Sequence, residues 1–293
     1  MAVVSPAGPV TPERLTAGVE VLRSWGLDVV VGEHAADRHP RLGYLAGADA
    51  DRAADLAAAW CDPEVAAVFC ARGGYGSLRT LERLDLDAMA TADPKILAGS
   101  SDITALHGVI GARCDVVTLF SPMVATEAFL EHAADREHLR ATLFTPDDTT
   151  VLRGPAPEAI VGGTARGPVA GGNLSLLVSG LGAPLTPPLP DGAIALVEDV
   201  GEAPYRVDHF LTHLLRAGWF DRVAGVALGS WHECGTPDEV REVVADRLAP
   251  LGVPVLWELG FGHGPFQLTV PLGVPATLDT DAGTLTLDGP ALA

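Results

Sequence analysis

Short apolar runs alternate with helical patterns along the first half of the chain, and this alternation constrains the fold most. Apolar runs at residues 2–4, 27–32, 65–71, 95–98 and 115–120 read as strands. Between them, Thr11 and Pro12 supply the N-cap and first position of a helix that ends near Ser24, and residues 50–60 and 102–112 are also helical in pattern. The alternation predicts βαβ units and a parallel sheet, with functional residues beyond the carboxyl ends of its strands.

The second half is expected to form a separate domain, because 293 residues exceed the usual size of one compact core. A helix is predicted over 126–143, and the Pro-, Gly- and Thr-rich stretch after it predicts the domain crossing. We therefore expect an α/β protein with an N-terminal, flavodoxin-like domain over 1–147 and a C-terminal α/β domain over 148–293. Alternating residues around an Asp-Ala-Gly turn in the tail predict a small antiparallel β element.

Charge and cysteine usage narrow the function classes. A formal net charge of −19 disfavours binding to nucleic acid or to an anionic membrane surface, although a local arginine can still hold a small anion. The four cysteines lack CxxC spacing, which predicts buried free thiols in a reducing compartment. The N-terminus has no signal-peptide pattern and no apolar run reaches the length of a membrane span, so a cytoplasmic location is expected.

The stretch "GSSD" at 99–102 stands where a strand is expected to end and a helix to begin. A serine there either caps the helix or is exposed as a nucleophile, with free helix N–H groups beside it for an oxyanion. The local pattern alone favours capping, because Ile103 stands where the nucleophile elbow G-x-S-x-G has its second glycine.

The stretch "RGGYG" at 72–76 follows the preceding strand and belongs to the same sheet edge. It is neither a Walker A loop nor a dinucleotide turn. Gly73 and Gly74 can bring backbone N–H groups close to a ligand, and Arg72 can hold a carboxylate. The structural alternative is a glycine-rich connection with a surface arginine.

Two further stretches carry an acid and a base. Glu198 and Asp199 end an apolar strand, so one carboxylate should point inward and need a partner. His263 lies on the glycine-rich loop "GFGHG", where a histidine taken alone is an ordinary loop residue. With a serine from "GSSD", they supply a nucleophile, an orienting acid and a base.

Two histidine-containing stretches do not predict a metal site. His209 and His213 lie one helical turn apart, but no glutamate follows the first as in HExxH and no third ligand stands out. "WHEC" at 231–234 has ligand-type residues at cramped spacing, which is typical of a loop at a strand end.

Taken together, these stretches resemble the serine LD-carboxypeptidase family. Its best-known members are cytoplasmic murein tetrapeptide carboxypeptidases, and a neighbouring branch confers self-immunity to microcin C-type antibiotics. The resemblance runs nearly end to end and in family order, through "YLAGADADRAADL", "FCARGGYGSLRTLERLD", "AGSSDITALH", "GGNLSLL", "LVEDVGEAPYRVDHFL", "LGSW" and "FGHGPFQLTVPLG".

The resemblance implies a catalytic triad of Ser101, Glu198 and His263. Ser101, not Ser100, matches the family's nucleophile, His263 would accept its proton, and Glu198 would orient the imidazole. The backbone N–H groups of Asp102 and Gly74 would form the oxyanion hole.

The resemblance also implies the partners of the site. A small peptide substrate would contact Arg72, Gly73 and Glu202, with no metal or organic cofactor. The family commonly dimerises, which implies a homodimer, although the sequence shows no clear interface.

Three positions depart from the family pattern without touching the triad. Ser100 replaces a common Tyr, Phe or His, Ser121 replaces a glycine, and His209 replaces an arginine, which weakens the case for carboxylate binding at that position.

The murein branch fits better than the immunity branch. After "GGN", the immunity branch carries a tryptophan-bearing loop that stacks on a nucleobase, whereas "GLGAPLTPPLPDG" here has no aromatic residue. Glu202 and Tyr205 also resemble the murein branch. Release of terminal D-Ala from a murein tetrapeptide is therefore predicted, and hydrolysis of an aminoacyl-nucleotide antibiotic is the alternative. A non-catalytic protein that binds a small acid is a third hypothesis, which does not require the triad residues to converge.

Overall fold

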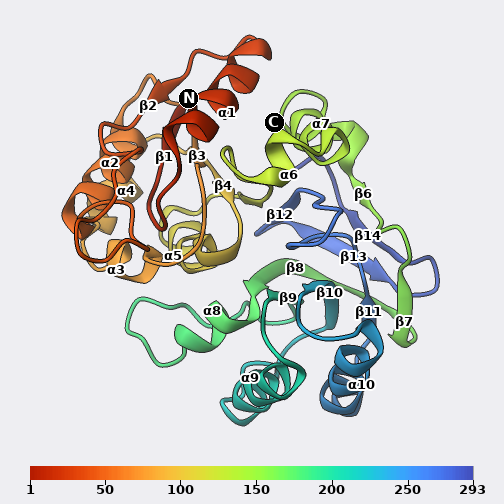
Figure 1. The fold of residues 1–293 in the computed structure, drawn as a ribbon. Coiled ribbons are helices and arrows are strands. Elements are labelled where there is room, and N and C mark those ends of the chain that lie inside the picture. The colour runs from red at the N-terminus through yellow and green to blue at the C-terminus, as the bar shows by residue number, and fades with distance from the viewer. Residues whose placement is uncertain (293) are drawn as a thin grey trace. The chain divides into compact units, whose positions relative to one another are not determined.

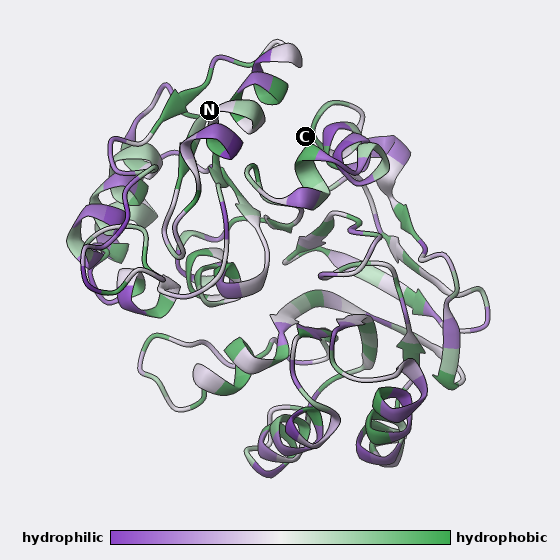
Figure 2. Ribbon diagram, in the orientation of Figure 1, coloured by the Kyte–Doolittle hydropathy of each residue, from purple (hydrophilic) through white to green (hydrophobic). Residues whose placement is uncertain are grey.

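The computed structural model describes residues 1–292 and divides the chain into two compact units, Met1–Arg136 and Glu137–Ala293. Both units are α/β, as predicted (Figure 1). Figure 2 shows mostly hydrophobic strands inside each unit and helices with one hydrophobic and one hydrophilic face. The predicted domain boundary between residues 147 and 148 stays a prediction.

The first unit is built around parallel strands in the order β5-β4-β3-β1-β2, which is the order of flavodoxin-like sheets. The strands are β1 (Ala2–Val4), β2 (Val30–Val31), β3 (Ala67–Cys70), β4 (Ile96–Gly99) and β5 (Thr118–Phe120). The helical segments are α1 (Pro12–Ser24), α2 (Asp49–Cys61), α3 (Ser77–Leu81), α4 (Leu86–Thr91), the 3₁₀ turn η1 (Ser101–Ile103), α5 (Thr104–Cys114) and α6 (Glu127–Leu130). The strand–helix alternation read from the sequence is confirmed.

The second unit contains a mixed sheet in the order β6-β14-β13-β8-β9-β10-β11-β7. Its centre, β8 to β11, is parallel, and antiparallel strands flank it on both sides. The strands of the second unit are β6 (Val151–Leu152), β7 (Glu158–Val161), β8 (Thr164–Asn173), β9 (Ile194–Val200), β10 (Gly225–His232), β11 (Val255–Trp257), β12 (Val270–Leu272), β13 (Pro275–Asp279) and β14 (Thr284–Leu287), and all but β12 belong to this sheet. The predicted tail hairpin is β13–β14, and it extends this larger sheet.

The helices of the second unit begin with clear sequence signals. They are α8 (Leu174–Ser179), α9 (Pro204–Arg216), α10 (Pro237–Leu248) and the 3₁₀ turns η2 (Pro146–Thr149) and η3 (Ala249–Leu251), while α7 (Ala133–Phe144) crosses the unit boundary. Asn173 caps α8, and Thr236 with Glu239 forms a capping box on α10. Buried aliphatic and aromatic side chains of α9 and α10 pack on the parallel strands.

Two local predictions are wrong, and three strands were not predicted. The helix predicted over 126–143 is broken into α6 and α7, and the Arg136 guanidinium donates to the carbonyls of Phe129 and Leu130 at the break. The Pro-, Gly- and Thr-rich stretch after it, for which no strand was predicted, contains β6, β7 and β8. The strand predicted over 27–32 is only Val30–Val31, and both side chains are exposed at the sheet edge.

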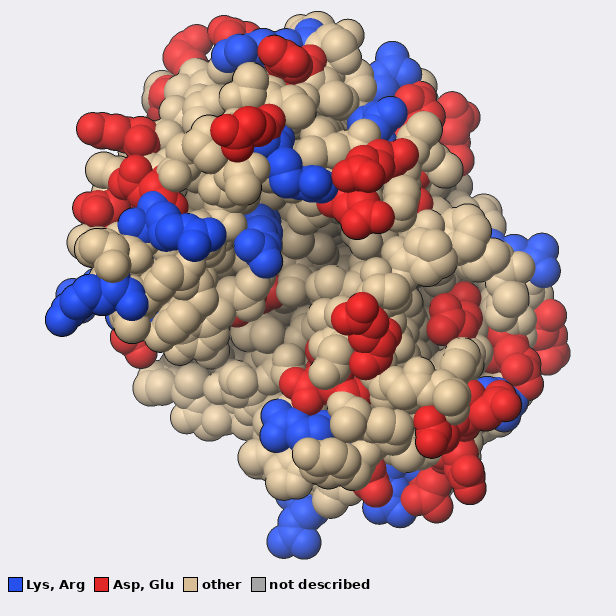
Figure 3. All heavy atoms as spheres, viewed as in Figure 1, with Lys and Arg blue, Asp and Glu red and all other residues tan. Residues whose placement is uncertain are grey.

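The structure also bears on the predictions made from cysteine usage, apolar runs and charge. All four cysteines are free, but Cys61 is exposed and Cys114 half-buried, so burial was predicted correctly only for Cys70 and Cys234. Within residues 1–292, no helix is long and apolar enough to span a bilayer. On the face shown in Figure 3, basic side chains lie in small groups separated by acidic and uncharged ones.

Candidate active site

Ser101 lies two residues beyond the end of β4, in a conformation that L-residues rarely adopt. Its φ is 61°, in the left-handed region, and it opens the turn η1. A non-glycine residue held there costs on the order of 1–3 kcal/mol, and such strain concentrates at functional sites. The capping interpretation is wrong, because Ser100 stands at the N-cap and makes no side-chain cap hydrogen bond.

Gly73 packs directly against Ser101. A Cβ atom added to Gly73 would lie 2.8 Å from Cβ of Ser101, 3.1 Å from its Oγ and 3.3 Å from the backbone nitrogen of Asp102. The Gly73 carbonyl accepts a hydrogen bond from the Gly8 N–H at 2.9 Å, and Gly74 follows with φ +100°. Only glycine fits at position 73, since any side chain would displace the serine.

The Asp102 side chain joins the serine turn to the glycine turn. Its Oδ2 accepts a hydrogen bond from the Ser77 N–H at 2.7 Å, at the first residue of α3. Burial raises the pKa of this carboxyl and outweighs the hydrogen bonds from Ser77 and Gly76 that lower it. The chain between Gly73 and Ser77 is therefore attached at both ends to the Ser101–Asp102 segment.

Arg72, a predicted substrate contact, lies at the start of this glycine turn. Its side chain is exposed and donates from Nη1 to the Pro9 carbonyl at 3.0 Å. A guanidinium has five N–H donors, so this contact leaves others for a substrate carboxylate.

Glu198 and His263 meet in the second unit. Nδ1 of His263 lies 2.7 Å from Oε2 of Glu198, whose side chain is fully buried, while 21% of the histidine side chain is exposed. A carboxylate only accepts, so Nδ1 carries the donated proton and Nε2 is left as a proton acceptor. The structure thus brings together two of the three predicted triad residues; Ser101 belongs to the first unit.

The charge of Glu198 sets the basicity of His263. Burial lowers the pKa of His263, but the charge of Glu198, the hydrogen bond to it and the charge of Asp199 raise it more, so the pKa lies above its usual value. A buried carboxylate beside the imidazole favours the charged ring that forms when the base takes a proton.

Both carboxylates at the end of β9 are buried, whereas the sequence predicted one. The Asn173 amide donates to Oε1 of Glu198 at 3.1 Å and to Oδ1 of Asp199 at 2.9 Å. Oδ2 of Asp199 accepts from the Ser175 N–H at 2.9 Å. Burial, followed by the neighbouring charge of Glu198, raises the pKa of Asp199 to about 6.

Sequence reasoning missed the supporting role of Asn173. Its place at the end of β8 beside Glu198 follows from the parallel register of β8 with β9. The signal available was the "GGN" stretch at a strand–helix junction, which was read only as part of the family resemblance.

Glu202 lies two residues before α9, and His209 lies within this helix. Oε2 of Glu202 accepts from Nε of Arg206 at 2.8 Å, so the carboxylate predicted to bind substrate already has a cationic partner. His209 packs near His213, with ring centroids 6.5 Å apart. Neither histidine belongs to a group of three metal-ligating side chains among the described residues.

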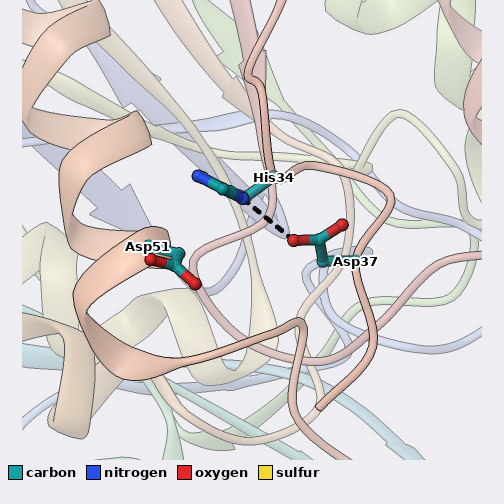
Figure 4. A group of neighbouring side chains, drawn as sticks. All are labelled: His34, Asp37 and Asp51. Atoms are coloured by element: carbon teal, nitrogen blue, oxygen red, sulfur yellow. Dashed lines mark hydrogen bonds and ion pairs between the residues drawn. The ribbon is translucent and has the colours of Figure 1, made fainter. Parts of the chain in front are cut away.

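His34, Asp37 and Asp51 form the group of described side chains that could hold a metal ion (Figure 4). Their ligand atoms lie within 4.8 Å of one another, and Nδ1 of His34 donates to Asp37 at 2.9 Å. That hydrogen bond is the largest cause of the raised pKa of His34. The three side chains are partly or fully exposed, and an exposed ion pair accounts for their arrangement.

Known proteins of one family are similar to both halves of this chain. Residues 1–121 match the model of the LD-carboxypeptidase N-terminal domain and residues 166–278 that of the LD-carboxypeptidase C-terminal domain. A Streptomyces coelicolor relative whose name assigns it to the carboxypeptidases is 55% identical over 293 residues, covering 100% of this chain and 94% of the relative.

Two solved structures share the fold. A muramoyltetrapeptide carboxypeptidase from Oxalobacter formigenes is 28% identical, with a TM-score of 0.83 and 98% of each chain covered. The immunity protein MccF in complex with glutamyl sulfamoyl guanosine is 25% identical, with a TM-score of 0.88, covering 100% of this chain and 96% of that one.

Proposed function

The chain belongs to the LD-carboxypeptidase family, and we propose that it is a serine carboxypeptidase that releases the terminal D-Ala of murein tetrapeptides. The observation that carries the proposal is the buried Glu198 bound to Nδ1 of His263 at 2.7 Å. Full burial of a carboxylate against a partly exposed imidazole costs folding free energy. Such perturbed ionisable pairs are concentrated at functional sites. The strained Ser101, beyond the carboxyl end of β4, is the matching nucleophile.

In the proposed reaction, Oγ of Ser101 attacks the carbonyl carbon of the L,D-amide bond. Its proton passes to Nε2 of His263, and Glu198 stabilises the imidazolium through Nδ1. The C–N bond then breaks, and the same proton goes to the departing amine of D-Ala. Water, deprotonated by His263, hydrolyses the acyl-enzyme and regenerates Ser101.

The oxyanion and the substrate carboxylate need their own partners. The backbone N–H groups of Asp102 and Gly74 are proposed as oxyanion donors, since Gly73 packs on Ser101 and leaves no side chain between them. Arg72 is proposed to hold the carboxylate of the departing D-Ala. Glu202 is proposed as a second substrate contact, which requires that it share or exchange its bond to Arg206.

The structural likeness to MccF keeps a second substrate class open. In that alternative the same triad hydrolyses the amide of an aminoacyl nucleotide. The proposal favours the peptide, because the chain between α8 and β9 carries no aromatic residue to stack on a nucleobase. A homodimer and a cytoplasmic location remain predictions from the resemblance.

The test is incubation of the purified protein with murein tetrapeptide and, separately, with an aspartyl sulfamoyl adenosine. We expect D-Ala release by the wild type and at least a 10⁴-fold loss in Ser101→Ala. Ser100→Ala is the matched control and should keep the activity. Turnover of neither compound, or undiminished turnover by Ser101→Ala, would refute the proposal; turnover of the nucleotide alone would favour the alternative.

A further inference from the structure

The loop that carries His263 is rich in glycine and follows β11. Gly260 and Gly262 both have positive φ, at 91° and 110°. A Cβ on Gly262 would lie 2.7 Å from Oε2 of Glu198 and 2.7 Å from Oγ of Ser230. The glycines thus let the backbone pass close to the buried carboxylate, while the side chains of Leu259 and Phe261 on the same loop are fully buried.

One buried hydroxyl attaches this loop to the sheet. Oγ of Ser230 accepts hydrogen bonds from the N–H groups of His263 and Gly264, both at 2.8 Å. The Ser230 N–H donates to the Phe261 carbonyl, also at 2.8 Å. Ser230 is 7% exposed, so three contacts of one buried residue fix the backbone on both sides of the imidazole.

The position of Ser230 comes from an irregularity of β10. The parallel register of β9 and β10 shifts between Leu228 and Trp231, so Ser230 lies within a bulge opposite the end of β9. Bulges re-aim side chains beside active sites. Here a Cβ on the preceding Gly229 would lie 2.9 Å from Cβ of Glu198, which shows how closely the bulge approaches the acid of the pair.

We propose that Ser230 is a positioning residue, whose hydroxyl holds the His263 backbone so that the imidazole stays against Glu198. The inference rests on the proposed function, which assigns Glu198 and His263 to catalysis. A hydroxyl suits this place, since its oxygen can accept two N–H donors at once, whereas an alanine accepts none. A loop shifted by about 1 Å misplaces the base and can cost about 100-fold in rate.

The test compares Ser230→Ala with Thr280→Val as the matched control. Thr280 is also buried in the second unit, and its hydroxyl accepts from the Gly163 N–H at 2.9 Å and donates to the Gly163 carbonyl at 3.1 Å. Both variants lose a buried hydroxyl that binds the backbone, so both should melt at a lower temperature. Only Ser230→Ala should lower kcat, by about 10- to 100-fold with KM nearly unchanged, and move the ascending limb of the pH profile to lower pH.

Labelling of the nucleophile by a fluorophosphonate separates this inference from the proposed function, because it requires no peptide substrate. We expect His263→Ala and Ser230→Ala to label slowly and Thr280→Val to label like the wild type. If His263→Ala labels like the wild type, the proposed function fails. If only His263→Ala is slow and Ser230→Ala matches Thr280→Val, the role of Ser230 is refuted and the triad stands.

A second variant covers the case in which Ser230→Ala does not fold. Ser230→Cys keeps a similar shape but offers sulfur, a weaker acceptor. Measured at a temperature where circular dichroism shows the folded state, its labelling rate should fall below that of the wild type. A wild-type labelling rate with Ser230→Cys would overturn the proposal.

Discussion

The region around Ser101, the proposed nucleophile, and the region around His263, the proposed base, hold these two side chains by different forces; we call them the nucleophile region and the base region. Ser101 is placed by backbone conformation and by close packing of Gly73, whereas His263 is placed by a buried charge and by hydrogen bonds. Packing contacts do not change with pH, whereas the charges of an imidazole and a carboxylate do. We therefore expect pH to act on the site mainly through His263 in the second unit, and an added methyl group at Gly73 to act on Ser101 by displacing it.

Removing the charge of the base region should have the largest effect. Glu198→Gln is expected to lower kcat by about 10³- to 10⁴-fold, since the amide neither stabilises the imidazolium nor enforces the Nδ1–H tautomer. Only neutral His263 acts as a base, and its pKa lies above the usual value. The pH profile of kcat/KM should thus rise with an apparent pKa above about 6.5 in the wild type and at lower pH in the variant. An unmoved profile in the variant would show that Glu198 does not set the basicity.

Adding one methyl group to the nucleophile region should have the next largest effect. Gly73→Ala places a Cβ 2.8 Å from Cβ of Ser101, so the serine must move. We expect about a 100-fold loss of kcat/KM with the fold retained, as measured by D-Ala release and circular dichroism. Gly162→Ala is the control, because a Cβ there meets nothing within 4 Å. Equal activity in both variants would contradict the steric account of Ser101.

Asp199 should make the stability of the protein fall as the pH rises. Its folded pKa is raised to about 6, so between about pH 4 and pH 6 the folded state binds more protons than the unfolded state. The free energy of unfolding should therefore decrease as the pH rises through this window, by an amount on the order of 3 kcal/mol if Asp199 alone contributes. Denaturant titrations of wild type and Asp199→Asn measure this, and the variant should lack that decrease. Parallel pH dependences would exclude Asp199 as the source.

Metal removal should have the smallest effect. The proposed chemistry uses Ser101, His263 and Glu198, so dialysis against a chelator should leave D-Ala release unchanged. His34→Ala should do the same, since His34 pairs with Asp37 outside the proposed triad. Loss of activity on chelation that Zn²⁺ restores would require a metal in the mechanism.

The fold was predicted from the sequence with good accuracy where the signals are local. The pattern of β1, α1, α2, β3 and β4 depends on periodicity and caps, which act within a few residues. The break between α6 and α7 was missed, because Arg136 binds carbonyls that a helical pattern treats as satisfied. The burial of both Glu198 and Asp199 was missed for a similar reason, since their shared partner Asn173 lies on another strand.

The sequence by itself determined the α/β alternation, the family and the identity of the triad candidates, because residue types and their order carry that information. Only the tertiary structure decided that Ser101 is held in a left-handed conformation and is not a cap. It also decided that Glu198 binds Nδ1 of His263 and that Ser230 holds the histidine loop. These contacts join residues that are far apart in sequence, with 65 positions between Glu198 and His263. They depend on strand register and on a bulge, and a local sequence pattern does not record either.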